Sequence, residues 1–329
     1  MTKVRVVHLL DDFAMGGVTN GLRVFDNPHL AKIAKTETVR INPQQWLAPK
    51  VLADIIVTHS PPRWKGMPFL VSLRWRNPDA QIIHVEHSYC RELETLHVRH
   101  QRRFHWLLKL AFRCADRVIA VSKAQAAWLI ETGAIAHNHI DVIYPYSRDQ
   151  GLSAVPALKR KFGDPLIVGS YGRFCEAKGY ERLIAAFKRL DAADTVQLVL
   201  GGMGERDAAL KQLAKGCDRI HFVGKVEDTA AFMRSIDVFA VPSLYETFGQ
   251  VASEAREAGR PLLVSTAGGL PEQVGKAGII VNCDNEDELL GALRTLHTLP
   301  LEEMGRAGRA EVQVCIQNRI AAWHAALCR

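Results

Sequence analysis

The chain has 329 residues, of which 48% are hydrophobic and 23% are charged. This is the composition of a soluble globular protein, and it excludes disordered, fibrous and collagen-like chains. Because a domain usually contains about 100–200 residues, the length predicts two domains. No apolar run approaches the roughly 20 residues of a membrane-spanning helix. The seven cysteines are dispersed and form no Cys-x-x-Cys pair, which predicts reduced thiols and a cytoplasmic protein.

The net charge of +7 belongs to one half of the chain. Residues 1–150 contain 20 basic and 13 acidic side chains, whereas residues 151–329 contain 22 of each. Ten of the 13 histidines also lie in the first half. A basic surplus confined to one half predicts that this half meets an anionic partner.

Short β-rich apolar runs alternate with helical patterns along the chain. In the first half, strands are predicted near residues 4–10, 38–41, 54–58, 81–86, 117–121 and 141–144. In the second half, they are predicted near residues 166–171, 195–200, 220–223, 237–241, 261–265 and 278–281. Helices are predicted between the latter, at 178–190, 205–215, 227–235, 247–258 and 286–297. Strands that are apolar on both faces suit parallel sheets covered by helices, so both halves are predicted to be α/β.

The boundary between the predicted domains lies in residues 145–156, a polar stretch that prolines interrupt. A helix-like segment, residues 157–162, follows it. The domains are therefore expected to span residues 1–148 and 149–311. The remaining segment, 312–329, includes an amphipathic helix that could pack on the second domain or return to the first. The apolar side chains on one face of this helix are Ile320, Trp323 and Leu327.

Two carboxylates mark the loop after one predicted strand of the second half. Glu246 and Glu254 are eight residues apart, with Phe248-Gly249 between them, at the start of a predicted helix. Helix N-termini at the carboxyl ends of parallel strands are where α/β folds bind phosphorylated ligands. Taken alone, the two carboxylates are equally consistent with solvated helix residues.

Cations and glycines follow other strands of the second half. Arg173 and Lys178 lie five residues apart between Gly172 and Gly179, and such cations can bind phosphate oxygens, although exposed cations beside a turn are common. Residues 265–272 contain adjacent glycines whose backbone N–H groups can face a ligand. The sequence Gly202-Met203-Gly204 lacks the third glycine of a dinucleotide fingerprint, because Asp207 stands there, which disfavours a dinucleotide oxidoreductase.

Together these motifs resemble the nucleotide-sugar domain of GT-B glycosyltransferases, and more narrowly the retaining family 4 (glycosyl transferases group 1). The resemblance covers residues 166–320 almost continuously and implies two Rossmann-like domains with parallel sheets that face each other across a cleft. It implies that Arg173 and Lys178 bind the donor diphosphate and stabilise the leaving group. Glu246 would bind hydroxyls of the transferred sugar. These three residues, with His87 below, are the four predicted catalytic residues.

The same resemblance implies further donor-binding residues. The backbone of Phe248 and Gly249 would help Glu246, and Glu254 would bind the two ribose hydroxyls. The strand end that includes Gly224 would line the base. The roles suit the chemistry, since a carboxylate accepts two vicinal hydroxyls and a diphosphate leaving group needs positive charge.

A glycine-rich loop after the first strand, with Gly16 and Gly17, resembles the family's N-terminal loop, whose backbone approaches the donor phosphate and the acceptor. The sequence departs from the family at Thr19-Asn20, where members often carry a Glu or Gln and a basic residue, and a plain strand-to-helix turn is the alternative. Ser122 resembles a family residue at another strand end and is included among the donor-binding candidates.

His87, at the end of a predicted strand, matches the family histidine that contacts a hydroxyl of the reacting sugar. His84 is the competing candidate, and a histidine at a strand end is often structural. No Asp-x-Asp pair and no paired zinc spacing occur in the sequence. We therefore expect no metal and no cofactor, with a nucleotide-diphosphate sugar of the UDP or GDP type as co-substrate.

The sequence thus predicts a retaining, metal-independent, hexosyltransferase-type enzyme that moves a sugar to a glycan or lipid-linked acceptor in polysaccharide or glycolipid synthesis. The resemblance also implies same-face attack, in which the departing phosphate deprotonates the acceptor hydroxyl. A nucleotide-sugar epimerase of the same fold, which the spacing of the two glutamates fits poorly, and a non-catalytic nucleotide-sugar-binding protein are the alternatives.

The basic first half predicts an anionic acceptor or the inner face of a membrane, to which a cytoplasmic protein would bind peripherally. A basic amphipathic helix at residues 99–113 could lie on such a surface or pack its apolar face into the core. No nucleic-acid partner is expected, because no recognised binding module occurs.

Overall fold

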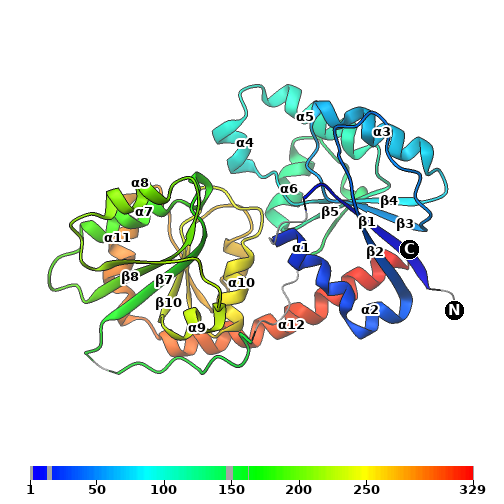
Figure 1. The fold of residues 1–329 in the computed structure, drawn as a ribbon. Helices are drawn as coiled ribbons and strands as arrows, with labels where there is room; N and C mark the ends of the chain where they lie inside the picture. Colours follow the sequence, from blue (N-terminus) through cyan, green and yellow to red (C-terminus); the bar gives the residue numbers. More distant parts are fainter. Residues whose placement is uncertain (1–2, 13–16, 146–150, 162, 329) are drawn as a thin grey trace. The chain divides into compact units, whose positions relative to one another are not determined.

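The contacts of the computed structural model divide the chain into two compact units (Figure 1). Unit 1 comprises Met1–Arg148 with Ile316–Arg329, and unit 2 comprises Asp149–Cys315. The residues that the structure describes are 3–12, 17–145, 151–161 and 163–328.

Unit 1 contains a six-stranded parallel sheet in the order β2-β1-β3-β4-β5-β6. The strands are β1 (Val4–Leu10), β2 (Ala34–Arg40), β3 (Ile55–Thr58), β4 (Gln81–Glu86), β5 (Arg117–Ala120) and β6 (Ile140–Val142). The α-helices described within it are α1 (Gly17–Gly21), α2 (Pro28–Ile33), α3 (Met67–Arg76), α4 (Arg91–His97), α5 (Gln101–Phe112) and α6 (Lys123–Glu131). Short 3-10 helices occur at η1 (Leu22–Asp26), η2 (Trp64–Gly66) and η3 (His137–His139). Every residue of β3 is buried, which explains why this strand is apolar on both faces.

Unit 2 contains a second six-stranded parallel sheet, in the order β12-β11-β10-β7-β8-β9. Its strands are β7 (Leu166–Arg173), β8 (Val196–Met203), β9 (Ile220–Gly224), β10 (Val238–Val241), β11 (Leu262–Val264) and β12 (Gly278–Ile280). Its helices include α7 (Tyr180–Lys188), α8 (Asp207–Ala214), α9 (Thr229–Arg234), α10 (Gln250–Glu257) and α11 (Glu286–Thr295). Its 3-10 helices include η4 (Glu176–Lys178), η5 (Pro271–Gln273) and η6 (Leu296–Thr298). The predicted α/β class is confirmed, and each predicted strand overlaps an observed one.

The last helix, α12 (Leu301–Leu327), is assigned to unit 1 from Ile316 onward. There the Trp323 ring packs at 4.9 Å, centroid to centroid, from the Phe25 ring. Trp323 and Leu327 are buried and Ile320 is half-buried. The apolar stripe of this helix therefore packs on unit 1. No described helix is both long enough and apolar enough to cross a membrane.

The prediction of a helix at 157–162 is wrong for its described part. Residues 157–161 have no regular structure, and residue 162 lies outside the described residues. A helix of six residues gains little from its own hydrogen bonds. Here the Arg160 backbone N–H donates to the Glu302 carboxylate at 3.0 Å, and the Arg160 guanidinium pairs with Asp237 at 2.5 Å. These contacts, with burial of Leu158 in the core, hold the segment in an irregular conformation.

The basic helix predicted at 99–113 is observed as α5, and its apolar face is part of the core. Leu108 and Phe112 are buried in a cluster with Trp128 of α6 and Val118 of β5. The apolar face of this helix therefore packs into the core of unit 1.

Candidate active site

Two oppositely charged residues meet at the carboxyl edge of the sheet in unit 2. Lys178 ends η4, which follows β7, and Glu246 lies in the loop after β10. Because β7 and β10 are neighbouring parallel strands, these loops leave the sheet at the same edge. Lys178 Nζ lies 2.5 Å from Glu246 Oε2, and the two side chains are only 25% and 15% exposed. Burial lowers the pKa of Lys178, but the Glu246 carboxylate outweighs it and the pKa is raised, so the ammonium stays charged.

The backbones of the two loops are also in contact. The Leu244 N–H donates to the Ala177 carbonyl oxygen at 2.8 Å. Gly179 adopts a left-handed conformation, with φ of 63°, and a Cβ there would lie 2.1 Å from the Pro242 carbonyl oxygen. Only glycine permits this approach, so Gly179 is a condition for the contact between Lys178 and Glu246.

Arg173, the last residue of β7, is exposed at the same edge. Within the described part of the chain, it has no ion pair. The two predicted phosphate-binding cations therefore lie near the end of the same strand, but of the two only Lys178 forms an ion pair with a carboxylate.

Glu254 lies on α10 and is buried, with 7% of its surface exposed. It accepts a hydrogen bond from the Tyr171 hydroxyl of β7. Burial raises the pKa of Glu254, against the lowering effect of this hydrogen bond. Burial and the neighbouring Glu254 raise the pKa of Tyr171 well above its ordinary value. Sequence reasoning missed Tyr171, whose only signal was a hydroxyl near the carboxyl end of a largely apolar strand.

A glycine shifts the start of α10. The predicted helix at 247–258 begins instead at Gln250, because Gly249 has φ of 85° and is the N-cap. The buried Gln273 side chain donates to the carbonyl oxygens of Phe248, at 2.5 Å, and Gly249, at 3.1 Å. The Ser253 hydroxyl in turn donates to Gln273 at 2.6 Å. Sequence reasoning missed Gln273, which stands one residue beyond the glycine-rich motif and fixes the loop that carries Glu246.

Three of the predicted donor-binding residues lie at the ends of strands or helices. Gly224 ends β9 with φ of 69°. Gly17 begins α1, whereas Gly16 lies outside the described residues. Ser122 is fully buried, and its hydroxyl accepts a hydrogen bond from the Gln125 N–H at 3.1 Å, so it caps the N-terminus of α6.

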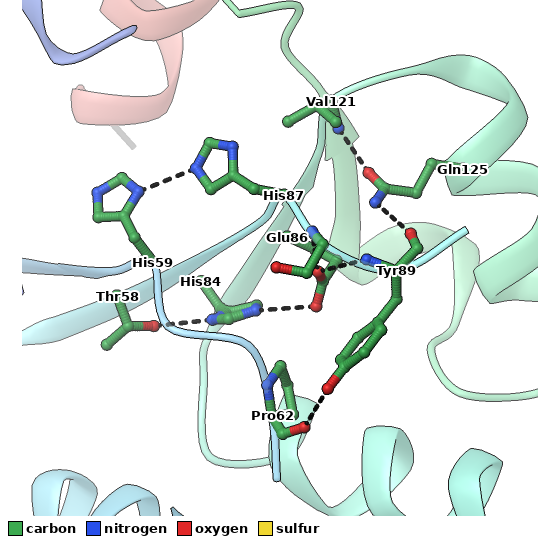
Figure 2. A network of polar contacts seen from close by, with 10 residues as sticks. Thr58, His59, Pro62, His84, Glu86, His87, Tyr89, Val121 and Gln125 are labelled. Atoms are coloured by element: carbon green, nitrogen blue, oxygen red, sulfur yellow. Dashed lines mark hydrogen bonds and ion pairs between the residues drawn. The ribbon is translucent and has the colours of Figure 1, made fainter. Parts of the chain in front are cut away.

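Histidines gather at the carboxyl edge of the sheet in unit 1. His87 directly follows β4, and its Nε2 lies 3.0 Å from Nδ1 of His59, which follows β3 (Figure 2). His59 Nε2 lies 3.0 Å from Nδ1 of His8 in β1. The strands β1, β3 and β4 are consecutive neighbours in the sheet, which places the three rings in a row.

His84, the competing candidate, belongs to a second network in Figure 2. It is buried, with its Nδ1 2.9 Å from the Thr58 hydroxyl and its Nε2 3.4 Å from Glu86. Glu86 also accepts hydrogen bonds from the backbone N–H groups of Ser88, at 2.7 Å, and Tyr89, at 3.1 Å. These contacts hold the turn that carries His87, so His84 has a structural role.

The row of histidines predicts a stability that falls in mild acid. Burial lowers the pKa of His8 to about 3 and that of His87 to about 4. Burial, and then the neighbouring histidines, lower that of His59 well below 6.5. In the unfolded chain, the three histidines have their ordinary pKa of about 6.5. Below that pH, the unfolded chain therefore binds protons that the folded chain does not. Stability is complete above pH 6.5 and falls as the pH decreases toward 4, by up to about 1.4 kcal/mol per pH unit for each histidine.

Thermal unfolding at a series of pH values from about 8 to 5 measures this effect. We expect the midpoint to fall steeply below pH 6.5, before most carboxylates titrate, and to fall less steeply in His8→Phe. A midpoint that stays constant down to pH 5 would show that the three rings are not buried as neutral groups.

Across the described ranges, no three His, Cys, Asp or Glu side chains are grouped so that they could hold a metal ion. All seven cysteines are free thiols.

Two parallel α/β units, one with a cation and carboxylates at the carboxyl edge of its sheet, define a GT-B-type fold. Residues 25–146 match the model of Glycosyltransferase Family 4, and residues 165–298 match that of Glycosyl transferases group 1. The chain belongs to the GT-B glycosyltransferases of these families.

Relatives in sequence and in structure are consistent with this family. The chain is 31% identical to alpha-maltose-1-phosphate synthase of Mycolicibacterium smegmatis over 65% of its own length and 62% of that protein. It spans less than two thirds of the curated relatives that it matches first. Sucrose-phosphate synthase of Thermosynechococcus elongatus has a similar fold, with a TM-score of 0.77, 22% identity and coverage of 99% and 98% of the two chains. HepE of Anabaena, solved in complex with UDP and glucose, gives a TM-score of 0.73, 20% identity and coverage of 98% and 99%.

Proposed function

We propose that this protein transfers a sugar from a nucleotide-diphosphate sugar to a glycan or lipid-linked acceptor, in polysaccharide or glycolipid synthesis. The observation that carries the proposal is the pair formed by Lys178 and Glu246 at the carboxyl edge of unit 2. Such an edge is where open α/β sheets bind their ligands. The proposal is supported by the family of the chain and by the structure of HepE, which was solved with UDP and glucose.

The donor is proposed to bind to unit 2. Lys178 and Arg173 would neutralise the diphosphate as it leaves, which needs no metal ion. Glu246 keeps the ammonium of Lys178 charged and in place, and its carboxylate would accept hydrogen bonds from the sugar hydroxyls. Glu254 would accept hydrogen bonds from the ribose, as an acceptor-only carboxylate can.

The acceptor is proposed to bind to unit 1, with His87 beside the reacting sugar. In the same-face reaction, the bond from the anomeric carbon to the phosphate oxygen breaks and a bond to the acceptor oxygen forms. The acceptor proton passes to the departing phosphate oxygen, so the anomeric configuration is retained. The neutral state of His87 suits a hydrogen-bonding role, because a neutral imidazole adds no charge near the anomeric centre.

The basic surplus of residues 1–150 supports an anionic acceptor. The M. smegmatis relative, which is named for a phosphorylated sugar, agrees with this proposal. A cytoplasmic protein at the inner face of a membrane is the second possibility. Trp106 of α5, which is 58% exposed, and Lys109, whose Nζ lies 5.7 Å from the centre of that ring, favour it.

The proposal is tested by incubating the protein with a panel of UDP- and GDP-sugars and measuring the nucleoside diphosphate released. We expect release from at least one donor and a loss of about 100-fold or more in Glu246→Gln. Glu181→Gln is the matched control, because Glu181 forms an exposed ion pair with Arg206 in the same unit. An epimerase would change the sugar without releasing the nucleotide, and a binding protein would leave the donor intact; either result would contradict the proposal.

A further inference from the structure

The three histidines of unit 1 form one continuous row of hydrogen bonds. Nδ1 of His8 lies 3.0 Å from Nε2 of His59, and Nδ1 of His59 lies 3.0 Å from Nε2 of His87. The rings of His59 and His87 are stacked, with centroids 5.3 Å apart. His8 and His59 are buried, at 1% and 6% exposure. The central ring uses both of its nitrogens in the row.

Each of the three rings carries a single N–H hydrogen, because burial keeps all three neutral at pH 7. A neutral imidazole is a donor at one nitrogen and an acceptor at the other. The hydrogen bonds of the row must therefore all run in the same direction. Either His8 donates to His59 and His59 to His87, or both bonds are reversed.

The far end of the row selects the direction. Nε2 of His8 is buried and has no hydrogen-bond partner among the described residues. If the bonds ran from His87 toward His8, this nitrogen would carry an orphaned N–H, which is rarely found in protein interiors. If they run from His8 toward His87, Nε2 is only an unused lone pair, beside the Phe25 ring at 4.7 Å between centroids. The second direction places the hydrogen of His87 on Nδ1.

We propose that His59 is a positioning residue that donates from Nδ1 to Nε2 of His87 and so fixes His87 as the Nδ1–H tautomer, a hydrogen-bond donor toward the transferred sugar. The assignment of a sugar contact to His87 rests on the proposed function, whereas the tautomer rests on the row alone. The charged and titratable groups that act on His59 and His87 include His8, His84 and Glu86. Among them, His84 and Glu86 belong to the network that holds the His87 turn.

The tautomer is measured by long-range ¹H–¹⁵N NMR of the ¹⁵N-histidine-labelled protein, with the His87 signals assigned by their loss in His87→Gln. We expect one slowly exchanging tautomer with the hydrogen on Nδ1. In His59→Phe, which removes the donor, the Nε2–H tautomer of His87 should appear. In His59→Asn, whose amide can replace Nδ1, the Nδ1–H form should persist. His8→Phe provides a second test if His59→Phe does not fold. Nε2 of His59 then has no acceptor beside it, so the row should keep its direction and His87 should keep its Nδ1–H form.

Kinetics of the same variants test the consequence for transfer. We expect kcat to fall about 10- to 100-fold in His59→Phe, the range typical for partners that orient a functional histidine, with the donor KM nearly unchanged. His59→Asn should recover most of the rate, and His139→Asn, at an exposed histidine of η3, should behave as the unmodified protein.

Two results would overturn the proposal. One is a His87 ring with its hydrogen on Nε2 in the unmodified protein or in His8→Phe, or a tautomer that does not change in His59→Phe. The other is a changed tautomer without a change in kcat, which would show that the row does not serve transfer. If the unmodified protein transfers no sugar from any donor, the proposed function fails, while the NMR measurement still decides the role of His59.

Discussion

Replacing Lys178 by methionine is expected to lower kcat for sugar transfer by about 100- to 1,000-fold, the loss typical when one stabilising group of a developing anion is removed. Methionine keeps an unbranched, flexible side chain but removes the charge that would meet the leaving diphosphate. The donor KM should change less than kcat, because negative charge on the leaving group increases as the bond breaks. Initial rates with the best donor of the panel measure both quantities.

Lys178→Met also leaves the partly buried carboxylate of Glu246 without its partner, so the protein should unfold at a lower temperature. Lys188→Met is the control, since within the described residues this exposed lysine of α7 donates to the Leu213 carbonyl oxygen, at 2.9 Å, and forms no ion pair. Its rate and melting temperature should stay close to those of the unmodified protein. Equal rates of transfer in the Lys178 and Lys188 variants would show that Lys178 has no role in the reaction.

Gly179→Ala is expected to destabilise unit 2 and to slow transfer together. The left-handed φ of 63° costs an alanine about 1–2 kcal/mol, and the Cβ at 2.1 Å from the Pro242 carbonyl oxygen adds an overpacking cost of about 1–3 kcal/mol. Because the clash is with backbone, the loops after β7 and β10 must move apart. That movement would separate Lys178 from Glu246, so kcat should fall as well as the free energy of unfolding.

Gly216→Ala separates the cost of the left-handed conformation from the cost of the clash with backbone. Gly216 also has a left-handed conformation, with φ of 82°, but no atom lies within 4 Å of a Cβ built there. This variant should lose only about 1–2 kcal/mol in urea denaturation and keep its rate. If Gly179→Ala lost no more stability than Gly216→Ala and transferred sugar normally, the two loops would not depend on close contact.

Much of the fold could be predicted from hydrophobic patterning. Strands such as β3 and β10 are entirely buried, and a short apolar run between helical patterns identifies them without tertiary information. Each of the two errors has a specific structural cause. The start of α10 depends on the conformation of Gly249, and the irregular segment at 157–161 depends on an ion pair with Asp237, which is distant in the sequence.

The candidate site could be predicted only in part. The spacing of Glu246 and Glu254 and the Arg173–Lys178 loop were visible as motifs, but the contact between Lys178 and Glu246 requires that β7 and β10 be neighbours. Tyr171 was missed because its partner is 83 positions away. His59 carried a weak signal, since it follows a buried strand just as His87 does, but only the strand order places the two rings together.

The central claim is that unit 2 binds a nucleotide-diphosphate sugar at the edge that carries Lys178. A crystal structure of the protein with bound UDP or GDP tests it most directly. The account predicts that the diphosphate contacts Lys178 and Arg173 and that the ribose hydroxyls contact Glu254. A nucleotide bound away from this edge, with Lys178 still paired to Glu246 and Glu254 still bonded only to Tyr171, would contradict it.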